Sequence, residues 1–148
     1  MLLALSDIRQ QSAHDCGEAA TRVILAHQNI TAAVRLATPQ HGTDPTQIES
    51  ALRRIGLLVT AGEMSIEDLR HYCDDSRPVI ALVHWPTWED SHFVCVRGVS
   101  RGRVYYHDVS DGPGKCSVND WLAAWSAEGR VGTFRRWGIV AWPETRHP

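Results

Sequence analysis

The two halves of the chain carry different hydrophobic periodicities, and this division constrains the fold more than any other feature. In the first half, apolar residues recur at the three-to-four-residue spacing of amphipathic helices. The second half carries short apolar runs separated by Gly, Pro and Asp, which is typical of strands. Helices followed by antiparallel strands predict an α+β fold, with a helical N-terminal lobe and a β-sheet C-terminal lobe. The length of 148 residues fits one domain, so we expect residues 1–148 to form it.

Start and stop signals set the expected bounds of the elements. Asp44 is a good N-cap before Pro45, and Gly56 ends the same helix. Ser65 and Ser117 can each cap a helix, with an aspartate three residues later. We expect helices at 17–27, 45–55, 66–73 and 118–128, strands at 78–84, 92–99, 103–108 and 137–142, a hairpin turn at 101–102 and a loop at 111–114.

Composition excludes several classes of function. The formal net charge is -2 and no basic block stands out, so we expect no nucleic-acid partner. The apolar start of the chain is too short for a signal peptide, and no apolar run approaches membrane-spanning length. These features predict a cytoplasmic protein without direct membrane insertion. No histidine or cysteine pair has the tight spacing of a structural metal site, so we expect no metal and no other cofactor.

The four cysteines are not equivalent. None forms a C-x-x-C pair, and nothing indicates secretion, so free thiols are expected. Cys95 lies within an apolar strand and Cys73 near a helix end, as small core residues do. Cys16 directly precedes a helix, and unpaired N–H groups at a helix N-terminus stabilise a thiolate. Cys16 is therefore the candidate nucleophile, with a buried structural thiol as the alternative.

A thiolate nucleophile needs an imidazole partner and a group that orients the imidazole. His92 opens one predicted strand and Asp108 closes the next. Mirror counting about the turn at 101–102, with paired residues summing to about 203, places His92 near the Asp108 end of the hairpin. Asp111 is the alternative orienting residue. His14 is the less favoured alternative base, because two residues before a helix it should be exposed.

Acyl transfer also needs donors for the developing oxyanion. The backbone N–H of Cys16 can supply one, and the side-chain amide of Gln10 can supply the other.

The segment from Gln10 to Gly17 resembles the Q-x-x-x-x-[DE]-C-G motif of bacteriocin-processing cysteine peptidases. The run that begins at His92 resembles the H-[FY]-V-V-V-like strand of that family, and Asp108 follows at the matching interval of sixteen residues. The helix that ends at the Gly56-Leu57 pair is also similar, so the resemblance extends from about residue 5 to residue 142. It implies a papain-like peptidase fold, and it selects Gln10 rather than Gln11 for the oxyanion.

The resemblance further implies a function. Such domains are usually fused to the front of peptide-exporting ABC transporters and typically cut leader peptides after a Gly-Gly pair. The sequence departs from the family at Val109, where proline is common, and in the long tryptophan-rich loop at 85–91. No transporter follows Pro148, so we expect a freestanding protein or a fragment, with an exporter acting in trans.

The leading hypothesis is therefore a cysteine endopeptidase that removes leaders from small ribosomally made precursor peptides. Cys16, His92, Asp108 and Gln10 are its expected catalytic residues. The same groups could also serve an amidase, a deamidase or an acyltransferase on another substrate. A third hypothesis is a catalytically silent module that binds a peptide.

Overall fold

A computed structural model describes residues 2–12, 15–31, 34, 36, 44–88, 90–129 and 132–144. Its elements in chain order are α1 (Cys16–His27), α2 (Pro45–Ile55), β1 (Leu58–Glu63), α3 (Ile66–Asp74), β2 (Val79–Val83), β3 (His92–Ser100), β4 (Arg103–Asp108), β5 (Gly112–Ser117), α4 (Val118–Ala124), β6 (Ser126–Gly129), β7 (Gly132–Arg135) and β8 (Trp137–Trp142). The predicted α+β fold is confirmed: helices pack against an antiparallel sheet.

Local signals set the starts of α2 and α3. Asp44 and Gln47 form a capping box at the start of α2, and Gly56 ends that helix in the left-handed conformation, with φ of 100°. The Ser65 side chain accepts a hydrogen bond from the backbone of Asp68 at the start of α3. α1 begins one residue earlier than expected, at Cys16.

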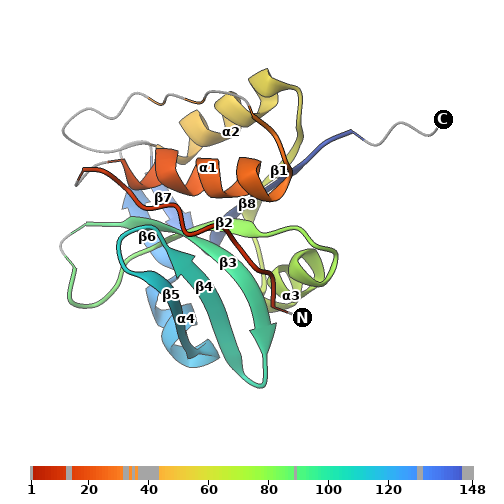
Figure 1. Cartoon of the computed structure of the whole chain (residues 1–148). Helices are drawn as coiled ribbons and strands as arrows, with labels where there is room; N and C mark the ends of the chain where they lie inside the picture. The colour runs from red at the N-terminus through yellow and green to blue at the C-terminus, as the bar shows by residue number, and fades with distance from the viewer. Residues whose placement is uncertain are drawn as a thin grey trace.

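The main sheet has six strands in the order β1-β8-β2-β3-β4-β5. α1 and α2 lie on one face of this sheet, whereas α3 and α4 lie on the other (Figure 1). β6 and β7 form a separate two-stranded hairpin. The last strand, β8, is inserted between β1 and β2, so residues from both halves of the chain share one sheet.

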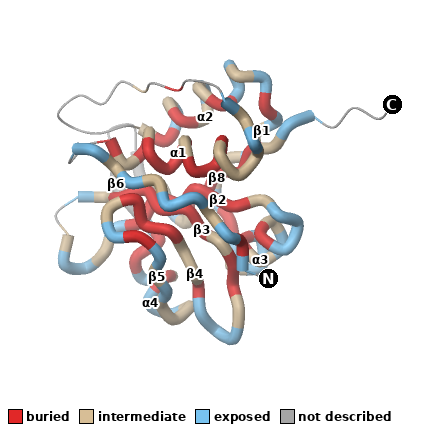
Figure 2. The backbone as a smooth tube through the Cα atoms, in the orientation of Figure 1, coloured by how far each residue is buried: buried red, intermediate tan, exposed pale blue. Residues whose placement is uncertain are grey.

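Two apolar clusters, one on each face of the sheet, form the core. The cluster beneath α1 contains Val23 and Ile24 packed with Phe93 of β3, and the opposite cluster contains Leu69, Trp121 and other residues of α3 and α4. Figure 2 shows that buried backbone is concentrated in α1 and the central strands. α1 is thereby fixed against β3, which is the strand that carries His92.

The N-terminal segment, residues 2–10, crosses the sheet before it reaches α1 (Figure 1). Leu3 exchanges two hydrogen bonds with Arg97 of β3, one from the backbone N–H and one to the backbone oxygen, at 2.7 and 2.8 Å. The buried His107 ring donates to the backbone oxygen of Ile8 at 2.9 Å. The backbone N–H of Gln10 donates to the oxygen of Val109 at 2.8 Å. These contacts hold Gln10 beside the end of β4.

Two sequence predictions about elements are wrong, and three strands were not predicted. The segment 111–114 was expected as a loop, but Gly112 already pairs with Asp108 as the first residue of β5. The fourth helix was expected to reach residue 128, but α4 ends at Ala124, because buried Trp125 makes long-range hydrogen bonds to Arg136 and Trp137 instead. β1 and the hairpin of β6 and β7 were not predicted at all.

Candidate active site

The site is built first around the start of α1. Cys16 is the first residue of this helix and is partly exposed. The buried Asp15 carboxylate accepts the backbone N–H groups of Gln11 and Ser12, both at 3.0 Å. Burial opposes the ionised carboxylate, but these backbone hydrogen bonds outweigh it and lower the pKa of Asp15. The charged Asp15 therefore holds the segment at residues 11–12 next to the start of α1.

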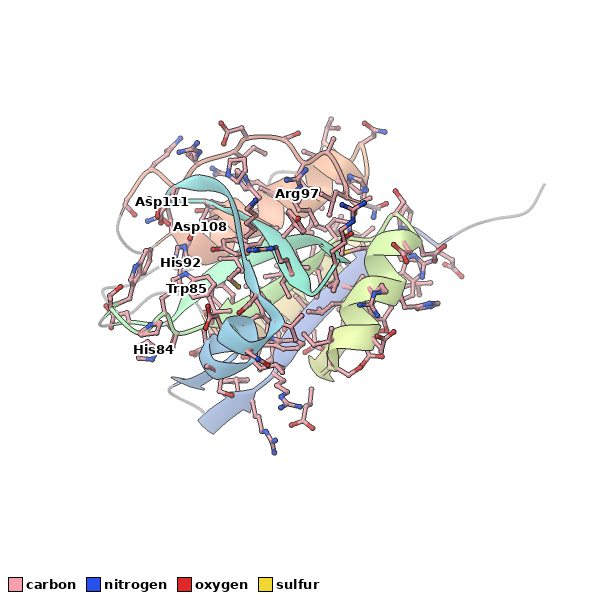
Figure 3. All side chains as sticks on the ribbon, turned by 90° about the horizontal axis from the view of Figure 1, so that it is seen from below. His84, Trp85, His92, Arg97, Asp108 and Asp111 are labelled. Carbon is pink, nitrogen blue, oxygen red and sulfur yellow. The ribbon has the colours of Figure 1, made fainter. Side chains whose placement is uncertain are left out.

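His92 links two of the other predicted residues. Its Nε2 atom lies 2.7 Å from Oδ1 of Asp108, and both side chains are buried, with 4% and 6% of their surfaces exposed. The Cys16 side chain is also close enough to the His92 ring to contribute, by hydrogen bonding and by charge, to the raised pKa of the ring. Because Asp108 occupies Nε2, the ring nitrogen left for the sulfur is Nδ1. Figure 3 shows His92 and Asp108 next to each other, with Trp85 nearby and Arg97 farther away.

The charges of this group reinforce one another. Burial disfavours the imidazolium, but the hydrogen bond to Asp108 and the contacts with Cys16 outweigh burial and raise the pKa of His92 to about 9. Burial likewise disfavours the Asp108 carboxylate, but its hydrogen bond and charge interaction with His92 lower the pKa of Asp108. The geometry therefore supports an imidazolium between a carboxylate and a sulfur at neutral pH.

A β-bulge sets which face of the sheet Asp108 occupies. Near the turn, β3 and β4 pair with residue numbers that sum to 203, as Val99 does with Val104. The register shifts between Val96 and Gly98, and beyond this point Val94 pairs with Asp108. Since side chains alternate along a strand, Asp108 lies on the same face as His92, two residues before Val94. An unbroken register would have placed Asp108 opposite Cys95, on the other face.

Gln10 joins the group through its side-chain amide. Its Nε2 donates to the backbone oxygen of Ser12 at 2.8 Å, and its Oε1 accepts from the Ser110 hydroxyl at 2.9 Å. The same Ser110 oxygen lies 3.4 Å from Nε2 of His92. The structure thus brings together all four predicted residues, although their chemical roles remain predictions.

Two further residues lie against this group, and one of them, Ser110, was not predicted. Ser110 also donates its backbone N–H to Oδ1 of Asp108 at 2.8 Å. Trp88 lies against His92, with ring centroids 4.7 Å apart, and its backbone oxygen is 2.9 Å from Nε2 of His84. The position of Ser110 just after the predicted aspartate was the signal available for it; Trp88 is placed by a loop that has no periodic pattern.

The structure also bears on the alternative orienting residue, the alternative base and the other three cysteines. Asp111 contributes a backbone hydrogen bond to Asp108, whereas the carboxylate that contacts His92 is that of Asp108. His14 lies outside the described residues. Burial raises the pKa of Cys116 to about 11 and that of Cys73 to about 12, and the pKa of fully buried Cys95 is also raised. Those three thiols are therefore protonated at neutral pH.

Two further findings concern ligands and membranes. Across the described ranges, no three His, Cys, Asp or Glu residues cluster in a way that could hold a metal ion. None of the helices in that part of the chain is long and apolar enough to cross a membrane.

Comparison with known proteins places this geometry in a family. The sequence model of the Peptidase C39 family matches residues 5–129, which is most of the chain. No curated protein sequence matches the chain.

Solved structures share the fold at low sequence identity. A double glycine motif protease from an AMS/PCAT transporter, in complex with the leader peptide, has a TM-score of 0.75 at 18% identity, covering 97% of this chain and 94% of that one. The peptidase domain of Streptococcus ComA, a bi-functional ABC transporter involved in quorum sensing, has a TM-score of 0.70 at 20% identity, covering 95% and 98%. A putative C39-like peptidase from Bacillus anthracis has a TM-score of 0.71 at 15% identity, covering 94% of each chain.

The family match and the shared fold agree with the papain-like peptidase architecture expected from the sequence motifs. The matched stretch contains all four predicted site residues, from Gln10 to Asp108. The chain belongs to the Peptidase C39 family, the cysteine peptidases whose fold it shares.

Proposed function

We propose that this chain is a cysteine endopeptidase that removes leader peptides from small ribosomally made precursors by cutting after a Gly-Gly pair. The observation that carries this proposal is the position of His92, which lies 2.7 Å from Asp108 and interacts with the Cys16 side chain on its other side. A nucleophile, a base and an orienting carboxylate are the groups that thiol-dependent acyl transfer requires.

In the first step, the Cys16 sulfur attacks the scissile carbonyl while its proton resides on His92. The C–N bond then breaks, the imidazolium gives this proton to the leaving amine, and a thioester remains on Cys16. In the second step, neutral His92 takes a proton from water, whose oxygen attacks the thioester and releases the leader with a new carboxylate. Asp108 keeps the ring oriented and stabilises its charged form throughout.

Two donors are available for the oxyanion in both steps. The backbone N–H of Cys16 belongs to the first turn of α1, where no intrahelical acceptor exists for it. The Gln10 Nε2 group uses one hydrogen on Ser12, so its second hydrogen remains for the oxyanion. This pair of donors supports the role proposed for Gln10.

The substrate class is inferred from relatives. One structurally similar protein is a double glycine motif protease solved with its leader peptide, and another is the peptidase domain of an ABC transporter. We therefore propose a double-glycine precursor peptide as the substrate and a peptide-exporting ABC transporter as the partner. A cytoplasmic location is consistent with four free cysteines.

We also propose that residues 1–148 form a single peptidase domain. β8 lies in the centre of the main sheet, between β1 and β2. The structural unit therefore extends at least to Trp142, beyond the stretch that the family model matches.

The test is to incubate the purified protein with synthetic precursors that carry Gly-Gly, or Ala-Ala in its place, and to identify products by mass spectrometry. We expect one cut, after the second glycine, that Cys16→Ala abolishes and Cys116→Ala preserves. Loss of ammonia would instead indicate an amidase or deamidase, and a new amide an acyltransferase. Slow, unselective alkylation of Cys16 by iodoacetamide, together with no product, would indicate a module that only binds peptides.

A further inference from the structure

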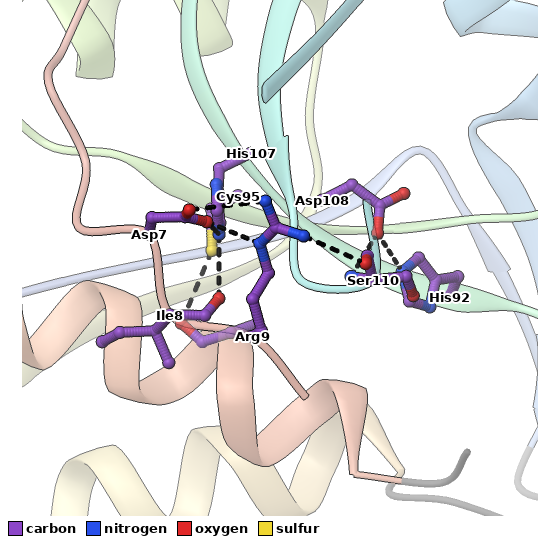
Figure 4. A network of polar contacts seen from close by, with 9 residues as sticks. Asp7, Ile8, Arg9, His92, Cys95, His107, Asp108 and Ser110 are labelled. Atoms are coloured by element: carbon purple, nitrogen blue, oxygen red, sulfur yellow. Dashed lines mark hydrogen bonds and ion pairs between the residues drawn. The ribbon is translucent and has the colours of Figure 1, made fainter. Parts of the chain in front are cut away.

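Ser110 contacts three of the four predicted site residues, and no role has yet been assigned to it. Its hydroxyl oxygen is 2.9 Å from Oε1 of Gln10 and 3.4 Å from Nε2 of His92, and its backbone N–H donates to Asp108. Figure 4 shows Ser110 beside Asp108 and His92, with Arg9 reaching the same loop. The Arg9 guanidinium donates to the backbone oxygen of Ser110 at 3.4 Å, which adds a further contact to that residue.

The directions of these hydrogen bonds are determined by chemistry. An amide oxygen only accepts, so the Ser110 hydroxyl must donate to Oε1 of Gln10. The backbone oxygen of Ser12 also only accepts, so the Gln10 group that faces it must be Nε2. The Ser12 contact selects this orientation of the amide, and the Ser110 hydroxyl, which can donate or accept, then donates to the oxygen that faces it. Rotating the amide by 180° would oppose two oxygens at Ser12.

The hydroxyl can also serve His92 without conflict. Once its hydrogen points at Gln10, the Ser110 oxygen has lone pairs left, and it can accept from Nε2–H of His92 as a second, longer partner beside Asp108. Each group then donates to the next one: His92 donates to Ser110, Ser110 to Gln10, and Gln10 to the backbone oxygen of Ser12. The two halves of the proposed machinery, the base and the oxyanion donor, are thus joined by one hydroxyl group.

We propose, on the basis of the peptidase function above, that Ser110 is a positioning residue that holds the Gln10 amide with its nitrogen toward the oxyanion. Its side-chain hydroxyl contacts Gln10 and His92, and its effect is exerted through Gln10. A flexible glutamine has several accessible rotamers, so fixing one of them in advance favours the transition state over the ground state.

The first measurement needs no substrate. The side-chain amide of Gln10 gives a pair of ¹H–¹⁵N signals that the Gln10→Ala variant identifies by their loss. Ser110→Ala should shift these signals and make them exchange faster with solvent, whereas Ser110→Thr should preserve them. The control is Ser126→Ala, since Ser126 is exposed on β6. Unchanged Gln10 signals in Ser110→Ala would overturn the proposal.

The second measurement is a double-mutant cycle on cleavage of a Gly-Gly precursor. Ser110→Ala should lower kcat about tenfold with little change in KM, because removing an oxyanion donor outright costs about 100-fold or more and a misaligned donor less. Ser110→Thr should restore most of the rate. In a Gln10→Ala background, Ser110→Ala should change kcat less than about twofold.

An equal loss of kcat in both backgrounds would overturn the proposal, since Ser110 would then act independently of Gln10. The rate of Cys16 alkylation by iodoacetamide, which forms no oxyanion, should be the same in Ser110→Ala and wild type; a lower rate would show a general disturbance of the site and would also overturn it. If the wild type cuts no precursor while the Gln10 signals still respond to Ser110→Ala, the proposed function fails and the positioning contact stands.

Discussion

Replacing Asp108 by Asn should move the alkaline limit of activity toward neutral pH. Asparagine keeps an oxygen that can accept from Nε2 of His92, so the ring stays oriented, but the negative charge is lost. That charge is part of what raises the pKa of His92 from 6.5 to about 9. The rise corresponds to about 3 kcal/mol in favour of the imidazolium, to which Cys16 also contributes.

The magnitude can be worked out at pH 8. With a pKa of about 9, about 90% of His92 carries the proton that the leaving amine needs, whereas at the ordinary pKa of 6.5 about 3% does. The protonation effect alone therefore lowers kcat/KM by at most about 30-fold at pH 8 and by less than twofold at pH 6. Because the Cys16 contribution remains in the variant, the observed loss at pH 8 should fall below this limit.

The assay is kcat/KM for a Gly-Gly precursor between pH 5 and pH 10, with a parallel NMR titration of the His92 ring. The titration needs no substrate and reports the same protonation directly. Asp111→Asn is the control, because its carboxylate is not the one that contacts His92, and its alkaline limit should match that of wild type. The reasoning is refuted if Asp108→Asn keeps an alkaline limit and a ring titration near pH 9.

Three further changes test the energetics of the fold. His92 has a raised pKa in the folded state, so its contribution to stability is complete below pH 6.5 and disappears as pH rises through about 9. The free energy of unfolding in urea should therefore fall across this pH range in the wild type, and His92→Gln should lack this fall. Gly138→Ala should cost about 1–3 kcal/mol in urea unfolding, because the added Cβ would lie 2.6 Å from the Met64 sulfur; a neutral result would mean that the core repacks freely. Trp125→Phe should destabilise the protein by about 1 kcal/mol more than Trp121→Phe. Of these two buried indoles, the Trp125 N–H donates to the backbone oxygen of Trp137, whereas the Trp121 N–H has no partner among the described residues. Equal losses of stability in the two variants would contradict this explanation.

The elements that could be predicted are those determined by neighbouring residues. The bounds of α2 follow from Asp44, Pro45 and Gly56, which act within a few residues of each other, and the structure reproduces these bounds. β1 has no comparable local signal: its burial alternates irregularly, and its pairing partner β8 lies far along the chain. Long-range pairing of this kind is invisible to periodicity.

The same distinction holds at the site. Placing Cys16 at a helix start needed only local signals, which the structure confirms. Mirror counting brought Asp108 to the correct end of the hairpin but could not choose its face, since the bulge between Val96 and Gly98 shifts the register by one residue. Ser110 was missed because its importance arises from contacts with Gln10, one hundred positions away in the chain.

The position of β8 inside the main sheet has a consequence for folding during synthesis. A nascent chain leaves the ribosome with its N-terminus first, so β2 through β5 can pair while the neighbouring position in the sheet is still vacant. Until Trp142 has cleared the exit tunnel, β1 has no neighbour and one flank of β2 is unoccupied. The six-stranded sheet is therefore complete only once β8 has been synthesised, and a chain that stops before Trp137 would leave β1 and one edge of β2 unpaired and prone to aggregation.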